Sequence, residues 1–338
     1  MTTTTAATTT TTTARATATA VTAASNAFVA GHLATATELG ERMAEVVHDP
    51  DAFVATTTRG FEALADPVYA DGSRSVAPGL GPVLGVRLPL MEAANKTFKR
   101  GTRRTSTVIL LDAMDRLLRH ELRELRWFGI WNLERLIATD PERTWQLLRR
   151  AAGEADEWIT VDTLAHPYGR GILADPRRWA EIEQLAFSPS RWERRLVGST
   201  LATMPHVDRK LGRDPAVVRR GISLVGQLIG DAEPDVQKAL SWALRNFAVL
   251  DPAPVTAFLE AEAEAARRSD DGGRAWVIRD SLNKLPADSA ARLRATVDGI
   301  RRRPGAPSTS RAAATAAQFD LTGAAQRPAA STGRNSAP

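Results

Sequence analysis

Proline spacing is the feature of this sequence that most constrains its fold. From Thr105 onward, helical patterns of about 10–18 residues alternate with short breaks, and most breaks carry an X-Pro pair. These pairs are Asp140-Pro141, His166-Pro167, Asp175-Pro176, Ser188-Pro189, Asp214-Pro215, Glu233-Pro234 and Asp251-Pro252. Proline fits the first turn of a helix, and the residue before it is held out of the helix. Each pair therefore predicts the end of one helix and the start of the next.

The apolar pattern predicts helices and no sheet. No segment shows the sustained polar–apolar alternation of a half-buried strand. Helix pairs repeat at an interval of about 40 residues, which is typical of a HEAT-like-repeat α-solenoid. The predicted fold is therefore all-α, a curved superhelix of antiparallel helix pairs with disordered termini, whose concave side is the usual binding surface.

Composition divides the chain into three parts. Residues 1–24 are Thr/Ala-rich and residues 304–338 are rich in Pro, Ala, Ser and Thr. Neither segment has enough apolar surface to offset its ordering entropy, so both are predicted to be disordered. The acid-poor residues 1–24 fit an N-terminal extension or a transit peptide, but lack the apolar core of a secretory signal. Residues 25–303 form the predicted helical repeat domain, with its binding face within about 105–285.

The first hundred residues are less regular. A helix is predicted over 25–47, and a second helix is predicted to start at an Asp51 cap. Residues 66–82 are rich in Pro and Gly and are interpreted as a loop. Pro89 marks the start of a helix that runs to about Arg100.

Composition also excludes several kinds of site. The chain has no cysteine and only five histidines, which lack the spacing that a metal site favours, so no metal or cofactor is expected. His120 and Glu124 share a helical face and are interpreted as a surface pair. The net charge of +5 is too weak to predict nucleic-acid binding without clustering on one face. No apolar run reaches the roughly 18–20 residues of a membrane span.

Trp158 and Asp162 are the first candidates for a functional site. They are four residues apart in a helical pattern, so the indole and the carboxylate share one face of the helix. Such a pair makes either a core contact with a satisfied carboxylate or a small binding site. The spacing alone leaves both interpretations open.

Two later helices also combine tryptophan with basic residues. One carries Trp192, Arg194 and Arg195, and the other carries Lys238, Trp242 and Arg245. On the second helix the apolar residues fall on the opposite, buried side; they are Val236, Ala239, Leu240, Ala243, Leu244 and Phe247. Cations and aromatic rings on one face are typical of nucleic-acid surfaces. The tryptophans could instead pack between helices as core residues.

An ordered set of motifs links these helices to a known family. The motifs are Leu84-Gly85-Val86-Arg87-x-Pro89, Trp158-x-x-Val161-Asp162, Trp192-x-x-Arg195 and Gln237-Lys238-Ala239-Leu240-x-Trp242-x-Leu244-Arg245. In order and separation, the span from about Leu84 to Leu285 resembles the AlkD family of HEAT-like-repeat DNA glycosylases. The departures are the long N-terminal extension, the Pro-rich tail and an expanded N-terminal region.

The resemblance implies an activity and a site. It implies a DNA glycosylase that releases N3- or N7-alkylated purines from duplex DNA without flipping the base. It assigns Trp158, Asp162, Trp242 and Arg195 as the site residues. Chemistry supports Asp162 and the two indoles as groups that stabilise a cationic sugar. Arg195, with Arg194, Lys238 and Arg245 nearby, would hold phosphates. The implied protein is a cytoplasmic, nucleoid-associated monomer.

Three alternatives stay open. Lys238 could act as a Schiff-base nucleophile and give lyase activity, but a phosphate anchor is favoured, which predicts a monofunctional enzyme. The same fold could recognise damaged duplex DNA without cleaving it. A protein–protein scaffold of the HEAT kind would instead show no salt-dependent binding to DNA.

Overall fold

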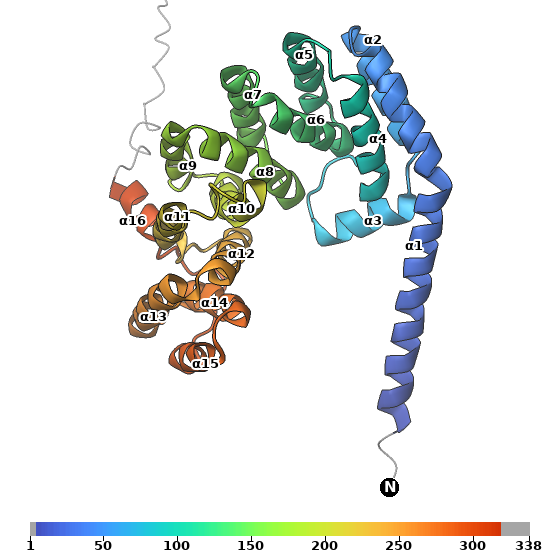
Figure 1. Ribbon diagram of the computed structural model, residues 1–338. Coiled ribbons are helices and arrows are strands. Elements are labelled where there is room, and N and C mark those ends of the chain that lie inside the picture. Colours follow the sequence, from blue (N-terminus) through green and yellow to red (C-terminus); the bar gives the residue numbers. More distant parts are fainter. Residues whose placement is uncertain (1–4, 319–338) are drawn as a thin grey trace, which may run out of the picture. The chain divides into compact units, whose positions relative to one another are not determined.

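The protein is built from helices alone in the part of the chain that is described. The computed structural model describes the backbone of residues 5–318 and the side chains from residue 22 onward (Figure 1). This range contains sixteen α-helices, two short 3-10 helices and no strand. The chain divides into two compact units, Met1–Pro176 and Arg177–Pro338. The all-α fold class is confirmed.

The described residues of unit 1 form eight α-helices. They are α1 (Thr5–Val46), α2 (Pro50–Glu62), α3 (Pro67–Val76), α4 (Leu88–Gly101), α5 (Thr107–Leu118), α6 (Arg123–Leu136), α7 (Pro141–Gly153) and α8 (Trp158–Ala174). The most extensive packing joins α1 to α4, α5 to α6 and α6 to α8. Helices α6 and α8 therefore form one packed layer of unit 1, and their side chains project from two helices that contact each other closely.

Phenylalanine rings form the centre of unit 1. Phe53, Phe61, Phe98 and Phe128 are fully buried. The ring centroids of Phe98 and Phe128 are 5.6 Å apart, as are those of Phe53 and Phe98. Tilted aromatic contacts at this range are favourable beyond the area that they bury. This cluster fixes α6 against α2 and α4.

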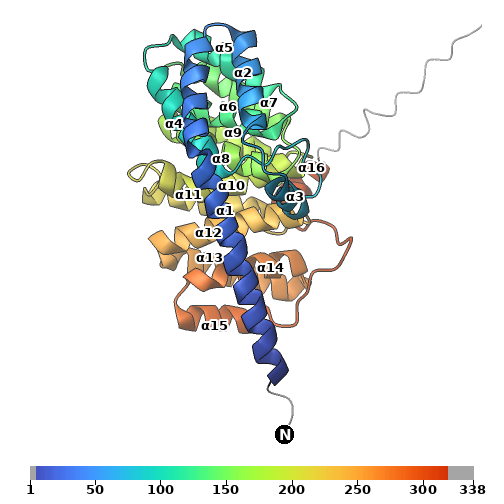
Figure 2. The ribbon, with the colours of Figure 1, turned by 90° about the vertical axis from the view of Figure 1, so that its right-hand side faces the viewer.

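Unit 2 continues the pattern of packed helices. They are η1 (Pro176–Arg178), α9 (Trp179–Leu185), α10 (Arg191–Val207), α11 (Pro215–Leu228), α12 (Pro234–Leu250), α13 (Pro252–Ser269), α14 (Gly272–Ser281), η2 (Leu282–Lys284), α15 (Ala287–Thr296) and α16 (Arg311–Gln318). Figure 2 shows α13, α14 and α15 following α12 within this unit. The helices α10 and α12 pack closely, since a Cβ atom at Gly198 would lie 2.7 Å from the backbone of Ala239.

Most of the X-Pro breaks are confirmed. Prolines occupy the first turn of α7, α11, α12 and α13. The side chains of Asp140, Asp214 and Asp251 accept hydrogen bonds from the first free N–H groups of their helices, which is the standard role of an N-cap. The prediction fails at Pro167, which lies buried inside α8. There the packing of an apolar helix outweighs the one backbone hydrogen bond that proline removes.

Two predictions in the first hundred residues are wrong. The stretch 66–82 contains α3, because Asp66 accepts hydrogen bonds from Val68 N and Tyr69 N and so caps a helix that begins at Pro67. This is the same Asp-Pro signal as in the later breaks, and it outweighs the Gly and Pro content. The cap of α2 is Asp49 rather than Asp51. The helix that begins next to Pro89 is confirmed as α4.

Described helices extend into both terminal segments, 1–24 and 304–338. Helix α1 begins at Thr5, within the Thr/Ala-rich segment 1–24, whose alanines favour helix. At the other end, Thr309 N donates to Gly230 O at 2.8 Å and Ala312 is buried, so residues up to 318 pack on unit 2. Residues 1–4 and 319–338 lie outside the described residues. None of the described helices is long and apolar enough to cross a membrane.

Candidate functional site

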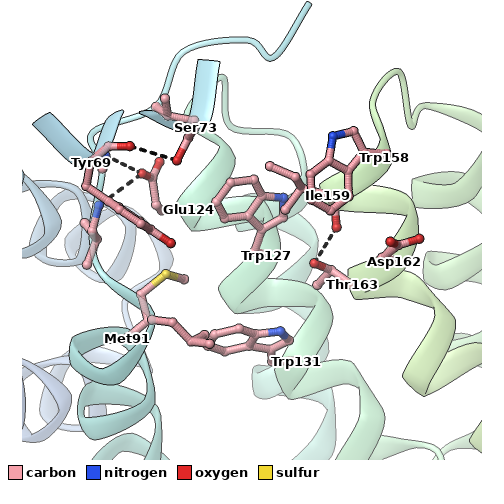
Figure 3. Close-up of a pocket in the computed structure, with 14 residues that line it drawn as sticks. Tyr69, Ser73, Met91, Glu124, Trp127, Trp131, Trp158, Ile159, Asp162 and Thr163 are labelled. Atoms are coloured by element: carbon pink, nitrogen blue, oxygen red, sulfur yellow. Dashed lines mark hydrogen bonds between the residues drawn. The ribbon is translucent and has the colours of Figure 1, made fainter. Parts of the chain in front are cut away.

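Trp158 and Asp162 stand at the start of α8. Glu157 is the N-cap of this helix and accepts hydrogen bonds from Ile159 N at 2.5 Å and Thr160 N at 2.8 Å. Its burial raises the pKa of the Glu157 carboxyl, although these N–H groups oppose the shift. The cap starts the helix at Trp158, so Asp162 follows one turn later (Figure 3). Both side chains are half-buried, so Asp162 does not lie in the core.

The two side chains line one pocket. Its volume is about 340 Å³, and it lies between four helices, α3, α4, α6 and α8, and the loop before α4 (Figure 3). From α6 it is lined by Trp127 and Trp131. Trp127 Nε1 donates to Thr160 Oγ1 at 2.8 Å, and Trp158 Nε1 donates to Val76 O at 3.2 Å. Hydrogen bonds therefore hold two of its three indoles in place.

The Leu84-Gly85-Val86 motif forms a wall of this pocket. The N–H groups of these three residues all donate to Glu124 Oε1, at 3.0, 2.8 and 3.3 Å. Gly85 has a φ of +81°, and a Cβ there would lie 2.2 Å from Asp66 O, so only glycine fits. The Leu84-Gly85-Val86 segment therefore has a structural role, since its three N–H groups converge on one carboxylate oxygen of Glu124.

Glu124 is not the surface residue that its spacing from His120 predicts. It is 1% exposed, because its carboxylate faces the loop before α4. His120 instead accepts a hydrogen bond from Leu122 N through Nδ1. Burial raises the pKa of the Glu124 carboxyl, although the loop N–H groups oppose the shift. Among the described residues, Glu124 Oε2 is buried without a hydrogen-bond partner.

An ion pair holds α3 beside the pocket. Arg87 bonds to Asp66 at 2.7 Å, and its guanidinium lies 5.0 Å from the centroid of the Tyr69 ring. Burial acts to raise the pKa of the Asp66 carboxyl, but hydrogen bonds from Arg87 and from the start of α3 lower it below its ordinary value. The arginine of the motif is thus structural, since it ties the cap of α3 to the start of α4.

A second ionic cluster continues along α8 beyond Asp162. Glu134 on α6 contacts Arg170 at 2.7 Å and His166 at 3.5 Å. Burial acts to raise the pKa of Glu134, but hydrogen bonds from His166 and Arg170 outweigh it and lower the pKa to about 2. This cluster joins α6 to α8 at the end of the pair away from the pocket.

The candidate arginines of α10 in unit 2 have acidic or carbonyl partners. Arg194 Nε donates to Asp231 Oδ2 at 2.7 Å, and its Nη1 donates to Ser188 O at 2.8 Å. Arg195 is buried, with Nη1 donating to Asp235 O at 2.8 Å. Both guanidinium groups connect α10 to the segment that begins α12.

On α12 the candidates differ in exposure. Lys238 is exposed and Trp242 is half-buried one turn later, and the apolar side predicted for this helix is buried. Arg245 Nη1 bonds to Asp280 Oδ2 and donates to Asp280 O at 3.0 Å. Lys238 is thus the most accessible cation among the candidates of this unit.

The structure brings the candidates together in two sets. Trp158 and Asp162 share the pocket of unit 1, while the other candidates lie on the α10–α12 pair of unit 2. Sequence reasoning missed the roles of Glu124, Trp127 and Trp131. The spacing of Trp127 and Trp131, four residues apart, could have shown that they share a helical face. No cluster of potential metal ligands occurs in the described part of the chain.

Comparison with known proteins agrees with the resemblance seen in the motifs. A search of curated proteins finds no match. The family model of the DNA alkylation repair enzymes matches residues 57–285. This match covers more than half of the chain and includes the pocket residues of α3, α4, α6 and α8 as well as helices α10 and α12. The chain therefore belongs to the DNA alkylation repair enzyme family.

Proposed function

We propose that this protein is a monofunctional DNA glycosylase that hydrolyses the N-glycosidic bond of N3- or N7-alkylated purines in duplex DNA. Its family gives it a role in the repair of alkylation damage. The observation that carries the finer proposal is the shared position of Trp158 and Asp162, half-buried on one face of α8 and lining one pocket. The Asp162 carboxylate and the Trp158 indole therefore lie side by side at the wall of this pocket.

Asp162 supplies the main chemical contribution in this proposal. Alkylation at N3 or N7 makes the purine cationic, so the base departs without a general acid. The barrier lies in the oxocarbenium-like sugar, as in glycoside hydrolysis. The Asp162 carboxylate would stabilise this positive charge and hold the attacking water. The water oxygen bonds to the anomeric carbon, its proton passes to the carboxylate or to solvent, and the electron pair of the broken bond neutralises the base.

The indole ring beside Asp162 provides a second contribution. The face of Trp158 presents a negative quadrupole to the cationic sugar, worth about 1–2 kcal/mol in a dry site. This contact stabilises the transition state more than the ground state, because the sugar is charged only in the transition state. Since the leaving base is already activated, the proposal requires no metal, no cofactor and no flipping of the base before hydrolysis.

Phosphate contacts are assigned to unit 2. Lys238 is exposed and can meet a phosphate directly. Contact by Arg194, Arg195 or Arg245 would compete with their present partners, so these residues also shape the α10–α12 surface. Lys238 acts here as an anchor and not as a Schiff-base nucleophile, which leaves an abasic site as the product. We expect the protein to act as a monomer.

The test is release of 3-methyladenine and 7-methylguanine from methylated duplex DNA. Asp162→Asn keeps the shape of the side chain and removes its charge. We expect base release to fall by about 10²–10³-fold, the scale for loss of one preorganised electrostatic group, with DNA binding retained. The matched control is Asp112→Asn, which removes a half-exposed carboxylate on α5 and is expected to leave the rate unchanged.

Three other results would reject the proposal. A wild-type protein that binds methylated DNA but releases no base is a recognition protein. A protein with no salt-dependent affinity for DNA fits a protein–protein scaffold. Equal rates of base release for the wild type and Asp162→Asn would mean that Asp162 takes no part in the hydrolysis.

A further inference from the structure

The pocket of unit 1 extends beyond the two residues that the proposed hydrolysis uses. Its other lining includes the indoles of Trp127 and Trp131, the thioether of Met91 and the carboxyl of Glu124 (Figure 3). At about 340 Å³, it falls within the range of small-molecule sites, about 300–1,000 Å³. Stabilising a sugar cation at Asp162 does not require this volume or these rings.

The lining selects against phosphate-bearing ligands. No Lys or Arg is among the described residues that line the pocket, while two carboxyl groups, Glu124 and Asp162, are. A nucleotide phosphate would lose its hydration there without gaining a cation. Three indoles favour a flat ring system, since bases stack on aromatic side chains through their faces.

Glu124 adds an unused polar group. Its Oε1 accepts all three N–H groups of the loop, while Oε2 is buried and has no hydrogen-bond partner among the described residues. Buried polar atoms without partners are rare and need an explanation. A ligand with a polar edge would satisfy this atom. The raised pKa of Glu124 is consistent with a carboxyl that can donate as well as accept a hydrogen bond.

We propose that this pocket is a binding site for the alkylated purine base itself, once it has left its sugar at Asp162. The base would stack against Trp127 or Trp131 and turn a polar edge to Glu124. The inference rests on the proposed function for the identity of the base. It follows from the same chemistry that the leaving base is neutral, because it takes the electron pair of the broken bond. A neutral, flat and partly polar molecule matches the apolar lining.

Binding of free 3-methyladenine to the full-length protein tests this inference. Quenching of tryptophan fluorescence and calorimetry would report the affinity. We expect saturable binding that weakens about tenfold or more in Trp131→Ala, within the range found when a stacking aromatic is removed. Glu124→Gln is the second variant, because it keeps the acceptor for the loop and changes the chemistry at Oε2. Trp276→Ala, which removes a half-buried indole of α14 outside the pocket, should bind as the wild type does.

The outcomes separate this inference from the proposed function. The inference is wrong if the wild type binds no 3-methyladenine at millimolar concentration. It is also wrong if Trp131→Ala and Glu124→Gln, both folded by circular dichroism, bind like the wild type. Tighter binding of deoxyadenosine monophosphate than of 3-methyladenine would also overturn it. If the free base binds and both variants weaken it while methylated DNA releases no base, the pocket stands and the glycosylase proposal fails.

Discussion

The helix pairs α6–α8 of unit 1 and α10–α12 of unit 2 show how one sequence pattern can have two structural outcomes. Both pairs carry a tryptophan four residues from a charged residue on one helix, Trp158 with Asp162 and Lys238 with Trp242. In unit 1 the carboxylate lines an aromatic pocket. In unit 2 most of the neighbouring cations already contact acids or carbonyls. Spacing predicts which residues share a face, but it does not predict which of them remain accessible to a ligand.

Burial makes the ion pairs of the unit 2 arginines more important for stability than the ion pairs of surface cations. The side chains of Arg194 and Asp231 are only 16% and 3% exposed. Removing one partner of such a pair leaves the other charge buried and uncompensated. Substitution of the arginines near the proposed DNA surface is therefore expected to lower the stability of the fold more than DNA binding. Substitution of the residues of the unit 1 pocket is expected to weaken ligand binding more than stability.

The largest effect should come from Arg194→Ala. The substitution leaves the buried Asp231 carboxylate without its cationic partner. We therefore expect the free energy of unfolding to fall by about 3–5 kcal/mol, the scale for breaking a buried ion pair. Chemical denaturation monitored by circular dichroism measures this change. Arg191→Ala is the control, because its contact with Glu233 is 3.6 Å long and both side chains are more than a third exposed. That variant should change stability by less than about 1 kcal/mol.

A different result would break the comparison between the two helix pairs. If Arg194→Ala keeps the stability of the wild type and loses affinity for DNA, its guanidinium is available to a phosphate. Unit 2 would then resemble unit 1 in having accessible functional groups.

A smaller effect should come from the ionic cluster of α6–α8. The pKa of Glu134 is lowered from 4.5 to about 2 in the folded protein, so folding favours the charged carboxylate. This stability is fully present above the unfolded value and is lost as the pH falls from about 5 towards 2. It amounts to at most about 3 kcal/mol. Glu134→Gln should therefore remove part of the acid sensitivity of the protein.

Unfolding by denaturant at pH 7 and at pH 3 measures this prediction. The difference in stability between the wild type and Glu134→Gln should shrink at the lower pH. Glu92→Gln, at an exposed position of α4, is the matched control and should follow the wild type at both pH values. A constant difference between the wild type and Glu134→Gln would mean that His166 and Arg170 do not stabilise the carboxylate.

Local signals in the sequence predicted much of this fold, and long-range partners account for the rest. Asp140 before Pro141 predicts a helix start because cap and proline act within one turn. Asp66 before Pro67 carries the same signal, and only its Gly-rich surroundings concealed it. The failure at Pro167 is of another kind, since the packing around α8 decides it.

The candidate site shows the same division. The face shared by Trp158 and Asp162 follows from helix geometry and was predicted. The role of Glu124 could not be, because its partners lie 38–40 residues earlier in the chain. The same holds for Arg194, whose acid lies 37 residues later. The spacing of Glu124 from His120 predicts a surface position. The Glu124 carboxylate is buried instead because a loop distant in the sequence directs three N–H groups towards it.

The smallest effect, and the one that sharpens the comparison most, should come from Lys238→Gln. Its side chain is exposed on α12, so we expect stability to stay within about 0.5 kcal/mol of the wild type. If Lys238 contacts a phosphate, the slope of log affinity for DNA against log salt concentration should decrease by about 1. Titrations at several salt concentrations measure that slope, with Lys96→Gln as an exposed lysine of unit 1 for comparison. Equal slopes for the two variants would mean that the α12 face binds DNA no more than any charged surface does. The functional residues would then be confined to the pocket of unit 1.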